Sequence, residues 1–354
     1  MSRIFSNIKK KLKKKYFFNE KYLILNDDAF KILKQLPDQS INLIIADPPY
    51  HTTKKANIIG DKDFDTDQEF INWIEKFIIE SKRLLKKSGS LYLFCSSKIS
   101  SRLEVMVRNH MNIISNITWT KPNDPGFDGW KQKVKIDNLR GWYNYSEKII
   151  HAEISEKGNL RNSYFGNFLK KARQQSGMST IELAEITKSY GKINHGGAIS
   201  NWEAGRNIPS RTQYELLSKA LKKKSKIKFP KYNDIIRPFN LNDKKNFTDV
   251  WDFPNVRPYK GKHPAEKPLE LIDHIIKSSS FKNDLVLDPF AGSFSTVKSA
   301  LKNSRIGIGI EIDKNLCKKS LVEIDSKKIK FLSDYNKKPK NQNIIYEGLF
   351  KNLK

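Results

Sequence analysis

The sequence predicts an α/β protein built on a parallel sheet, with a small all-α domain inserted in it. Residues 41–46 are a continuous run without charge, typical of a strand buried on both faces of a parallel sheet. A short strand over 22–25 and a helix beginning near Phe30 precede this run. Strand, helix and strand within about thirty residues make a βαβ unit, which places its two strands parallel.

The second observation is a change of pattern over residues 163–223, where short helices replace strands. Ser179 and Glu182 have the spacing of a capping box at a helix start, and residues 197–203 begin a further helix. The stretch resembles the helix-turn-helix of the Cro/repressor family, except that residues 192–196 widen the turn by about five residues. The alternative is a small helical bundle that only packs on the core.

Composition narrows the class of partner. The 354 residues include 66 Lys and Arg against 38 Asp and Glu, a net charge of +28. Such an excess favours a polyanion, nucleic acid before an acidic membrane surface. No apolar run reaches the roughly 18 residues that span a bilayer, so no membrane segment is expected. Cys95 and Cys317 are too few for a disulfide framework or a zinc site, which indicates a reducing, cytoplasmic location.

The apolar run 41–46 ends in Asp47-Pro48-Pro49-Tyr50. Because the prolines have no N–H to donate, the strand stops there, at the edge where α/β sheets bind ligands. Asp47 and the carbonyl of Pro48 can accept the two N–H bonds of an amino group on a planar base, and Tyr50 can stack on its ring. The alternative is a structural proline turn with a capping Asp.

A second strand, 284–287, opens into Asp288-Pro289-Phe290-Ala291-Gly292-Ser293, and the strand 306–310 ends in Glu311. Strand, glycine-containing turn, helix and a second strand ending in an acid are typical of dinucleotide folds, in which the acid binds ribose hydroxyls. Gly292 is the one glycine in the turn, so a loop that cradles a pyrophosphate is missing. The predicted ligand is an adenosine without pyrophosphate, S-adenosylmethionine.

These motifs together resemble the DNA amino-methyltransferases of the beta arrangement, which methylate exocyclic nitrogens of adenine or cytosine. The tetrapeptide 47–50 matches the catalytic motif, residues 287–293 the methionine-side loop, and 309–311 the ribose-binding strand end. Residues 263–268, His-Pro-Ala-Glu-Lys-Pro, match the cofactor-side motif, which implies that His263 and Lys267 lie at the cofactor. The resemblance covers roughly 21–152 and 249–325.

The resemblance implies a Rossmann-like sheet with a circularly permuted motif order, the catalytic motif before the cofactor motif. The five expected regions are a basic N-terminal arm, mobile and solvated (1–20), a catalytic half (21–152), a target-recognition region (153–248) containing the helix-turn-helix (163–223), a cofactor-binding half (249–325) and a basic C-terminal tail (326–354).

The expected activity is site-specific N6-adenine methylation of double-stranded DNA, as in restriction-modification or phage and orphan methylation. An acid at position 47 favours adenine, since relatives acting on cytosine N4 more often have serine there. The partners that the resemblance allows are a second copy of the chain and a cognate restriction endonuclease. The first alternative is an N4-cytosine enzyme; RNA methylation is disfavoured because a repressor-like domain suits a DNA major groove.

The second alternative is a DNA-binding regulator with weakened catalysis. The family usually has glycine after the Gly-Ser of the cofactor loop, where this chain has Phe294. A bulky side chain where the backbone approaches a ligand weakens cofactor affinity or shifts the loop.

Further candidate residues have a structural alternative beside the functional one. Asp28 and Ala29 are expected in the base pocket, with a helix cap as the equal alternative for Asp28. Lys121 and the lysines from Lys131 to Lys135, Lys133 included, are expected on phosphates, with a solvated face as the equal alternative. Ala198, Ser200 and Asn201 of the third short helix are expected to contact DNA. Core packing is expected for Trp119, Trp130 and Trp142, with stacking on bases as the alternative. No metal site is expected because His263 has no second ligand at suitable spacing.

Overall fold

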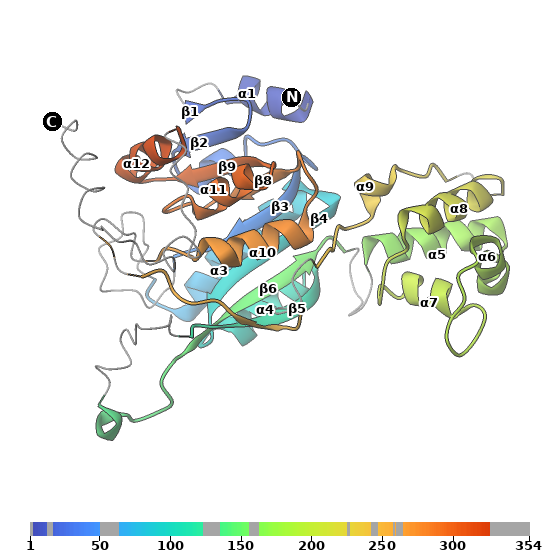
Figure 1. The fold of residues 1–354 in the computed structure, drawn as a ribbon, viewed down its shortest axis with the longest axis horizontal. Coiled ribbons are helices and arrows are strands. Elements are labelled where there is room, and N and C mark those ends of the chain that lie inside the picture. Colours follow the sequence, from blue (N-terminus) through green and yellow to red (C-terminus); the bar gives the residue numbers. More distant parts are fainter. Residues whose placement is uncertain are drawn as a thin grey trace, which may run out of the picture.

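The computed structural model places a mixed sheet between two layers of helices, with a second group of helices beside it (Figure 1). The structure describes residues 3–12, 17–49, 64–122, 135–155, 163–224, 227–241, 247–257, 259 and 265–325. The predicted α/β class is confirmed. Within the described residues no helix is long and apolar enough to cross a membrane.

Among the described residues, the sheet has nine strands in the order β1-β2-β9-β8-β3-β4-β6-β5-β7. The run from β2 through β9, β8 and β3 to β4 is parallel, whereas β4 with β6 and β6 with β5 are antiparallel. The strands are β1 (Phe17–Phe18), β2 (Tyr22–Asn26), β3 (Ile41–Ala46), β4 (Leu85–Ser96), β5 (Asn112–Thr120), β6 (Ser146–Glu153), β7 (Val250–Asp252), β8 (Leu285–Asp288) and β9 (Ile306–Glu311).

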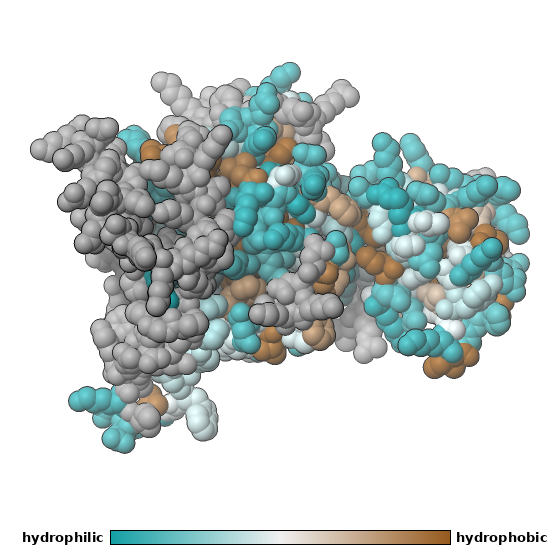
Figure 2. Space-filling view, viewed as in Figure 1, coloured by the Kyte–Doolittle hydropathy of each residue, from teal (hydrophilic) through white to brown (hydrophobic). Residues whose placement is uncertain are grey.

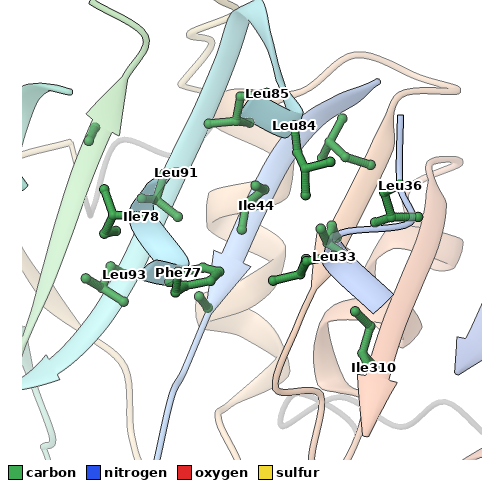
Figure 3. Packing of buried hydrophobic residues seen from close by; sticks show 14 of the residues in the cluster. Leu33, Leu36, Ile44, Phe77, Ile78, Leu84, Leu85, Leu91, Leu93 and Ile310 are labelled. Carbon is green, nitrogen blue, oxygen red and sulfur yellow. The ribbon is translucent and has the colours of Figure 1, made fainter. Parts of the chain in front are cut away.

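Strand β3 is buried on both faces, as its composition predicts. Ile44 joins the core on one face, whereas Leu43 and Ile45 join the core on the other. Figure 3 shows Ile44 beside side chains of helix α3 and strand β4. Full burial of one such side chain contributes about 1.5–3 kcal/mol. Strand β3 is therefore held firmly, and the residue that follows it is held with it.

Two sets of helices cover the two faces of the sheet. The first set packs through α1 (Arg3–Lys11), α2 (Ala29–Leu33), α3 (Asp67–Leu84) and α4 (Ser100–Arg108). The second consists of α10 (Leu269–Ser279), α11 (Ser295–Lys302) and α12 (Lys314–Asp325). A short 3-10 turn, η2 (Ile136–Asn138), lies between β5 and β6.

The remaining helices form a separate module with a core of their own, to the right of the sheet in Figure 1. They are α5 (Tyr164–Ser176), α6 (Thr180–Thr187), α7 (Gly197–Glu203) and α8 (Arg211–Lys222), followed by α9 (Tyr232–Ile235), which packs on β4. The capping box of Ser179 and Glu182 is confirmed at the start of α6. The visible face of the module is mainly hydrophilic, with scattered apolar patches (Figure 2).

Helices α5 and α7 of the module are held together by a close backbone contact and a partly buried ion pair. A Cβ on Gly166 of α5 would lie 2.4 Å from the carbonyl oxygen of Glu203, so only glycine lets α5 and α7 cross at this distance. The guanidinium of Arg173 binds the carboxylate of Glu203 through two nitrogens, with Nη2 3.0 Å from Oε2. Helix α7 is thereby held against α5.

The basic N-terminus differs from the expected solvated arm. Residues 3–11 form helix α1, and its Phe5 and Ile8 are fully buried against the sheet, together with Leu12. The spacing of these three side chains puts them on one helical face, while the lysines lie between them. The lysine run hides this periodicity in the sequence.

Three further details were not expected from the sequence. Strand β4 begins at Leu85, directly after helix α3 ends at Leu84. Strand β7 pairs with β5 in a parallel register, and α9 extends the chain between the two groups of helices. Trp119 is buried as predicted, but Trp142 is fully exposed, so the core packing expected for it is wrong. Trp130 and the tail 326–354 lie outside the described residues.

Candidate active site

Three carboxylates come together at one edge of the sheet, where three neighbouring parallel strands end. Asp47 follows β3, Asp288 is the last residue of β8, and Glu311 is the last residue of β9. Strand β8 pairs with both β3 and β9, so Asp288 lies between the other two acids. Neighbouring strands are about 4.8 Å apart, so the three acids lie close together at the edge where the motif spacing predicts ligand binding.

Asp47 is bound by a lysine from a distant part of the sequence. Nζ of Lys267, just before α10, donates to Oδ2 of Asp47 over 2.6 Å. Pro48 is buried and Pro49 half-buried, so the turn that carries Asp47 is packed. Lys267 was expected at the cofactor; the structure places its ammonium on the carboxylate that begins the catalytic motif.

A second acid contacts the same lysine. Oε2 of Glu147, near the start of β6, lies 3.5 Å from Nζ of Lys267, and its Oε1 binds the ammonium of Lys121. Burial alone lowers the pKa of Lys267, but Asp47 and Glu147 outweigh it, so the pKa is raised and the ammonium stays protonated. Sequence reasoning missed Glu147 and assigned Lys121 to phosphates, because the pairing joins strands far apart in the chain.

The loop after β8 is held by main-chain contacts. The N–H of Phe290 donates to Oδ1 of Asp288 over 3.1 Å, and the N–H of Ala291 donates to the carbonyl of Ile310 over 2.9 Å. The ring of Phe290 packs between Trp73 and Phe77 of α3. The loop therefore has a defined shape before any ligand binds.

The rest of this loop is equally restrained. Pro289 and Ala291 are buried, and Gly292 has a φ of 47°, a left-handed conformation that favours glycine. The carbonyl of Ser293 accepts from Nζ of Lys298 over 2.7 Å, and its hydroxyl lies 2.9 Å from that of Ser295.

Glu311 faces this loop with its carboxylate already oriented. Oε2 accepts from the N–H of Gly292 over 2.8 Å, and Oε1 accepts from the N–H of Asp313 over 2.8 Å. Each carboxylate oxygen can accept a further hydrogen bond, as from a ribose hydroxyl. Asn26 of β2 supports the strand end, because its side-chain nitrogen donates to the carbonyls of Glu311 and Ile312.

Burial changes the protonation of the two acids at this end. Burial raises the pKa of Asp288 to about 7, and the charges of Asp47 and Glu311 add to the rise. Burial also raises the pKa of Glu311, opposed by the backbone N–H groups of Asp313 and Gly292. Crowded carboxylates with raised pKa values are typical of a functional site.

Phe294 lies on the side of the loop away from this edge. Its side chain is fully buried in a cluster with Tyr22, Val297 and Cys317, between the sheet and helices α11 and α12. Gly309 of β9 makes the room, since a Cβ there would lie 2.6 Å from the Phe294 ring. The ring therefore packs in the core and not at the strand ends that carry the three acids. Phe294 has a left-handed φ of 60°, which is unfavourable for a residue with a side chain.

The two residues expected in the base pocket lie at the start of helix α2, after another strand. Asp28 caps α2, accepting from the N–H of Lys31 over 3.0 Å, and Ala29 is buried in the first turn. Both follow β2, which is three strands away from β3. At about 4.8 Å per strand this puts them roughly 14 Å from the end of β3, on the side of Glu311. The structure shows the helix-cap alternative for Asp28.

The three candidate DNA contacts of α7 differ in exposure. Ser200 is exposed, and Asn201 is half-buried with its Oδ1 3.2 Å from Nη1 of Arg206. Ala198 instead packs against the module core. Tyr50, His263, Lys131 and Lys133 lie outside the described residues.

Comparison with known proteins gives a consistent result. The chain is 29% identical over 313 residues to the DNA adenine methyltransferase YhdJ of Escherichia coli K12, covering 87% of this chain and 84% of that protein. It is 26% identical over 316 residues to the Type II methyltransferase M2.MboI of Moraxella bovis, covering 84% and 86%. The solved M1.HpyAVI-SAM complex is 21% identical, with 85% and 98% covered and a TM-score of 0.46.

A family model described as DNA methylase matches residues 41–323. The match begins with strand β3, includes the three strand ends that carry Asp47, Asp288 and Glu311, and extends over most of the chain. The chain therefore belongs to this DNA methylase family.

Proposed function

We propose that this enzyme transfers a methyl group from S-adenosylmethionine to the exocyclic N6 of adenine in double-stranded DNA. The observation that carries the proposal is the shared edge of β3, β8 and β9. There the ionised acid of the catalytic tetrapeptide lies beside the two acids of the cofactor half.

The residues at the ends of β8 and β9 fit the cofactor. Glu311 supports the ribose hydroxyls through a carboxylate that two backbone N–H groups orient. The loop 289–293 and Asp288 support the methionine end, together with His263 and Lys267 as the resemblance implies. When bound, S-adenosylmethionine supplies an activated methyl group on a positively charged sulfur.

The residues around Asp47 fit the amino group of a base. Asp47 and the carbonyl of Pro48 accept its two hydrogens, Pro49 keeps the turn rigid, and Tyr50 stacks on the ring. The amino nitrogen then directs its lone pair at the methyl group, so positioning and electrostatics supply most of the rate. The base must leave the duplex to reach this edge, which costs a few kcal/mol of unstacking.

Adenine is favoured over cytosine by two observations. An acid begins the tetrapeptide, and the relative YhdJ is named a DNA adenine methyltransferase. The regulator alternative loses its main argument, because Phe294 fills the core and leaves the loop backbone free to approach a ligand.

We assign target recognition to residues 153–248, with α5–α8 as an inserted helix-turn-helix of Cro/repressor type between permuted catalytic (21–152) and cofactor (249–325) halves. Support comes from the two consecutive helices α6 and α7 and from the exposed Ser200 and half-exposed Asn201 on α7. Lysines 131 and 133, the basic N-terminus and the tail 326–354 would add phosphate contacts. We further propose that the enzyme is cytoplasmic, that it acts as a homodimer, and that a cognate restriction endonuclease accompanies it.

The test is transfer of labelled methyl groups to plasmid DNA, followed by mass analysis of the nucleosides, with wild type, Asp47→Ala and Asp252→Ala. Asp252 lies on the exposed surface of β7 and serves as the matched control. We expect N6-methyladenine from wild type and Asp252→Ala and none from Asp47→Ala. N4-methylcytosine would establish the first alternative. If the protein bound duplex DNA but neither bound the cofactor nor transferred a methyl group, the enzyme proposal would be wrong and the DNA-binding regulator would be established.

A further inference from the structure

Four charged side chains of alternating sign form a chain that ends at the catalytic motif. They are Asp47, Lys267, Glu147 and Lys121, joined in that order. The side-chain exposures of Asp47, Lys267 and Glu147 are 19%, 10% and 14%. Their formal charges sum to zero when all four are ionised.

Aromatic rings enclose the two ammonium groups. Nζ of Lys267 lies 5.3 Å from the ring centre of Phe94 and 5.9 Å from that of Trp119, and Nζ of Lys121 lies 4.9 Å from the centre of Trp119. Trp119 is itself fixed, because its Nε1 donates to the carbonyl of Phe253 over 2.8 Å. If either lysine side chain moved away, it would lose its cation–π contacts and its ionic contacts together.

Strand pairing explains why these residues meet. Glu147 lies opposite Ser96 of β4 and Trp119 of β5, at the ends of those strands. Strand β4 runs parallel to β3, so its carboxyl end lies at the edge where Asp47 follows β3. Glu147 therefore reaches the edge that carries Asp47 although it belongs to the antiparallel part of the sheet. It lies in none of the motifs recognised in the sequence.

We propose that Glu147 is a positioning residue for methyl transfer: it holds the ammonium of Lys267 on Oδ2 of Asp47 and balances its charge. The inference rests on the proposed function and extends it to two residues, Glu147 and Lys267, that act through Asp47. Lys267 binds one oxygen of the carboxylate, so Asp47 meets the amino group of the base in one orientation.

The balance of charge matters because the methyl donor is itself a cation. With Glu147 ionised, the cluster is neutral; with Glu147 neutral, it carries a net positive charge beside a positively charged sulfur. Like charges at a buried edge are weakly screened, so this excess opposes the donor and weakens Asp47 as an acceptor. Glu147 also keeps Lys267 protonated, since its carboxylate is one of the two that raise the pKa of that lysine.

The competing explanation is that Glu147 only stabilises the fold, and β6 itself provides the matched control. Glu153, at the other end of the same strand, forms a comparably buried ion pair with Arg237, with Nε 2.9 Å from Oε2. It lies opposite Ser90 of β4, away from the catalytic edge. Glu147→Gln and Glu153→Gln therefore remove the same charge from the same strand, but only Glu147 contacts the lysine that binds Asp47.

The experiment measures methyl transfer by the full chain with wild type, Glu147→Gln, Glu153→Gln, Lys267→Arg and Lys267→Met. For Glu147→Gln we expect kcat to fall by roughly 10- to 100-fold, the cost of a misplaced reacting group, with the KM for DNA nearly unchanged. The alkaline limb of its pH profile should move to lower pH, because Lys267 loses a proton more easily. Lys267→Arg should retain more activity than Lys267→Met.

Thermal melting of each variant separates loss of fold from loss of positioning. If Glu147→Gln and Glu153→Gln lower kcat equally, or the alkaline limb of Glu147→Gln does not move, the inference is overturned. If Glu147→Gln does not fold, the Lys267→Arg and Lys267→Met comparison decides: equal activity in the two overturns it. If wild type transfers no methyl group to DNA, the proposed function fails instead, so the two failures are distinguishable.

Discussion

The edge of the sheet and the helical module place their candidate functional residues in opposite ways. At the sheet edge, Asp47, Asp288 and Glu311 follow buried strands, and main-chain N–H groups hold two of the three carboxylates. In the module, Ser200 and Asn201 lie on a helix face that is open to solvent. Two acids at the sheet edge are thus oriented by the protein's own main chain, whereas Ser200 of α7 is exposed to solvent.

This difference predicts two kinds of response to mutation. A change at the sheet edge removes a group with a fixed direction, together with the packing or hydrogen bonds that fix it, so large and specific effects follow. A change on α7 removes one exposed contact among several, so a smaller loss of affinity follows with the fold intact.

The largest effect is expected behind the sheet edge, at Phe294. Phe294→Ala should lower the free energy of unfolding by about 3–5 kcal/mol, the usual cost of deleting a buried ring. Phe294→Gly deletes the same ring but also relieves the left-handed φ of 60°. It should therefore be the more stable of the two variants by about 1 kcal/mol, measured by urea denaturation.

Cofactor titration of the same variants separates the enzyme from the regulator. Because the ring lies in the core, Phe294→Gly should bind S-adenosylmethionine about as tightly as wild type, within a factor of roughly three. A sharp gain from no measurable binding would show that Phe294 had blocked the loop, and would restore the regulator hypothesis. Tyr22→Phe, which keeps the volume of a neighbour in the same cluster, is the control.

The strand ends could be predicted from the sequence because each is marked locally. An apolar run that stops at Asp47-Pro48-Pro49 needs no tertiary information, and the same holds for the runs before Asp288 and Glu311. The α6 cap is equally local, since Ser179 and Glu182 are three residues apart. Parallel pairing then brings the three acids to one edge.

What the sequence could not show depends on contacts between distant segments. Lys267 and Asp47 are 220 positions apart, so nothing local indicates that they share a hydrogen bond. The direction of Phe294 depends on the space that Gly309 leaves on a neighbouring strand. The exposure of Trp142 follows from the path of its loop away from the sheet, which composition does not encode.

The second largest effect is expected at Glu311, the residue to which we assign the ribose of the cofactor. Glu311→Ala should raise the Kd for S-adenosylmethionine by roughly 10- to 100-fold, corresponding to about 1.5–3 kcal/mol for hydrogen bonds to a charged acceptor. Binding of duplex DNA should not change, because Glu311 faces the loop at Gly292. Calorimetric titration with cofactor and a gel-shift assay with DNA measure the two affinities.

Asp313→Ala is the appropriate control for that substitution. It removes a nearby half-buried acid but keeps the backbone N–H that orients Glu311. If both variants lose cofactor affinity equally, the loss comes from the general charge of the loop, and the ribose assignment of Glu311 is wrong.

The smallest effect is expected on α7. Asn201→Ala should weaken binding to a duplex containing the methylated site by about 1–2 kcal/mol, roughly 5- to 30-fold, the value of one base contact. Binding to a scrambled duplex and kcat at saturating DNA should stay near wild type, because the substitution leaves the catalytic edge untouched. Thr212→Ala, at an exposed position of the neighbouring helix α8, is the matched control. Fluorescence anisotropy with both duplexes measures the difference: if Asn201→Ala behaves like Thr212→Ala, the α5–α8 module only packs beside the sheet, and target recognition lies elsewhere in the chain.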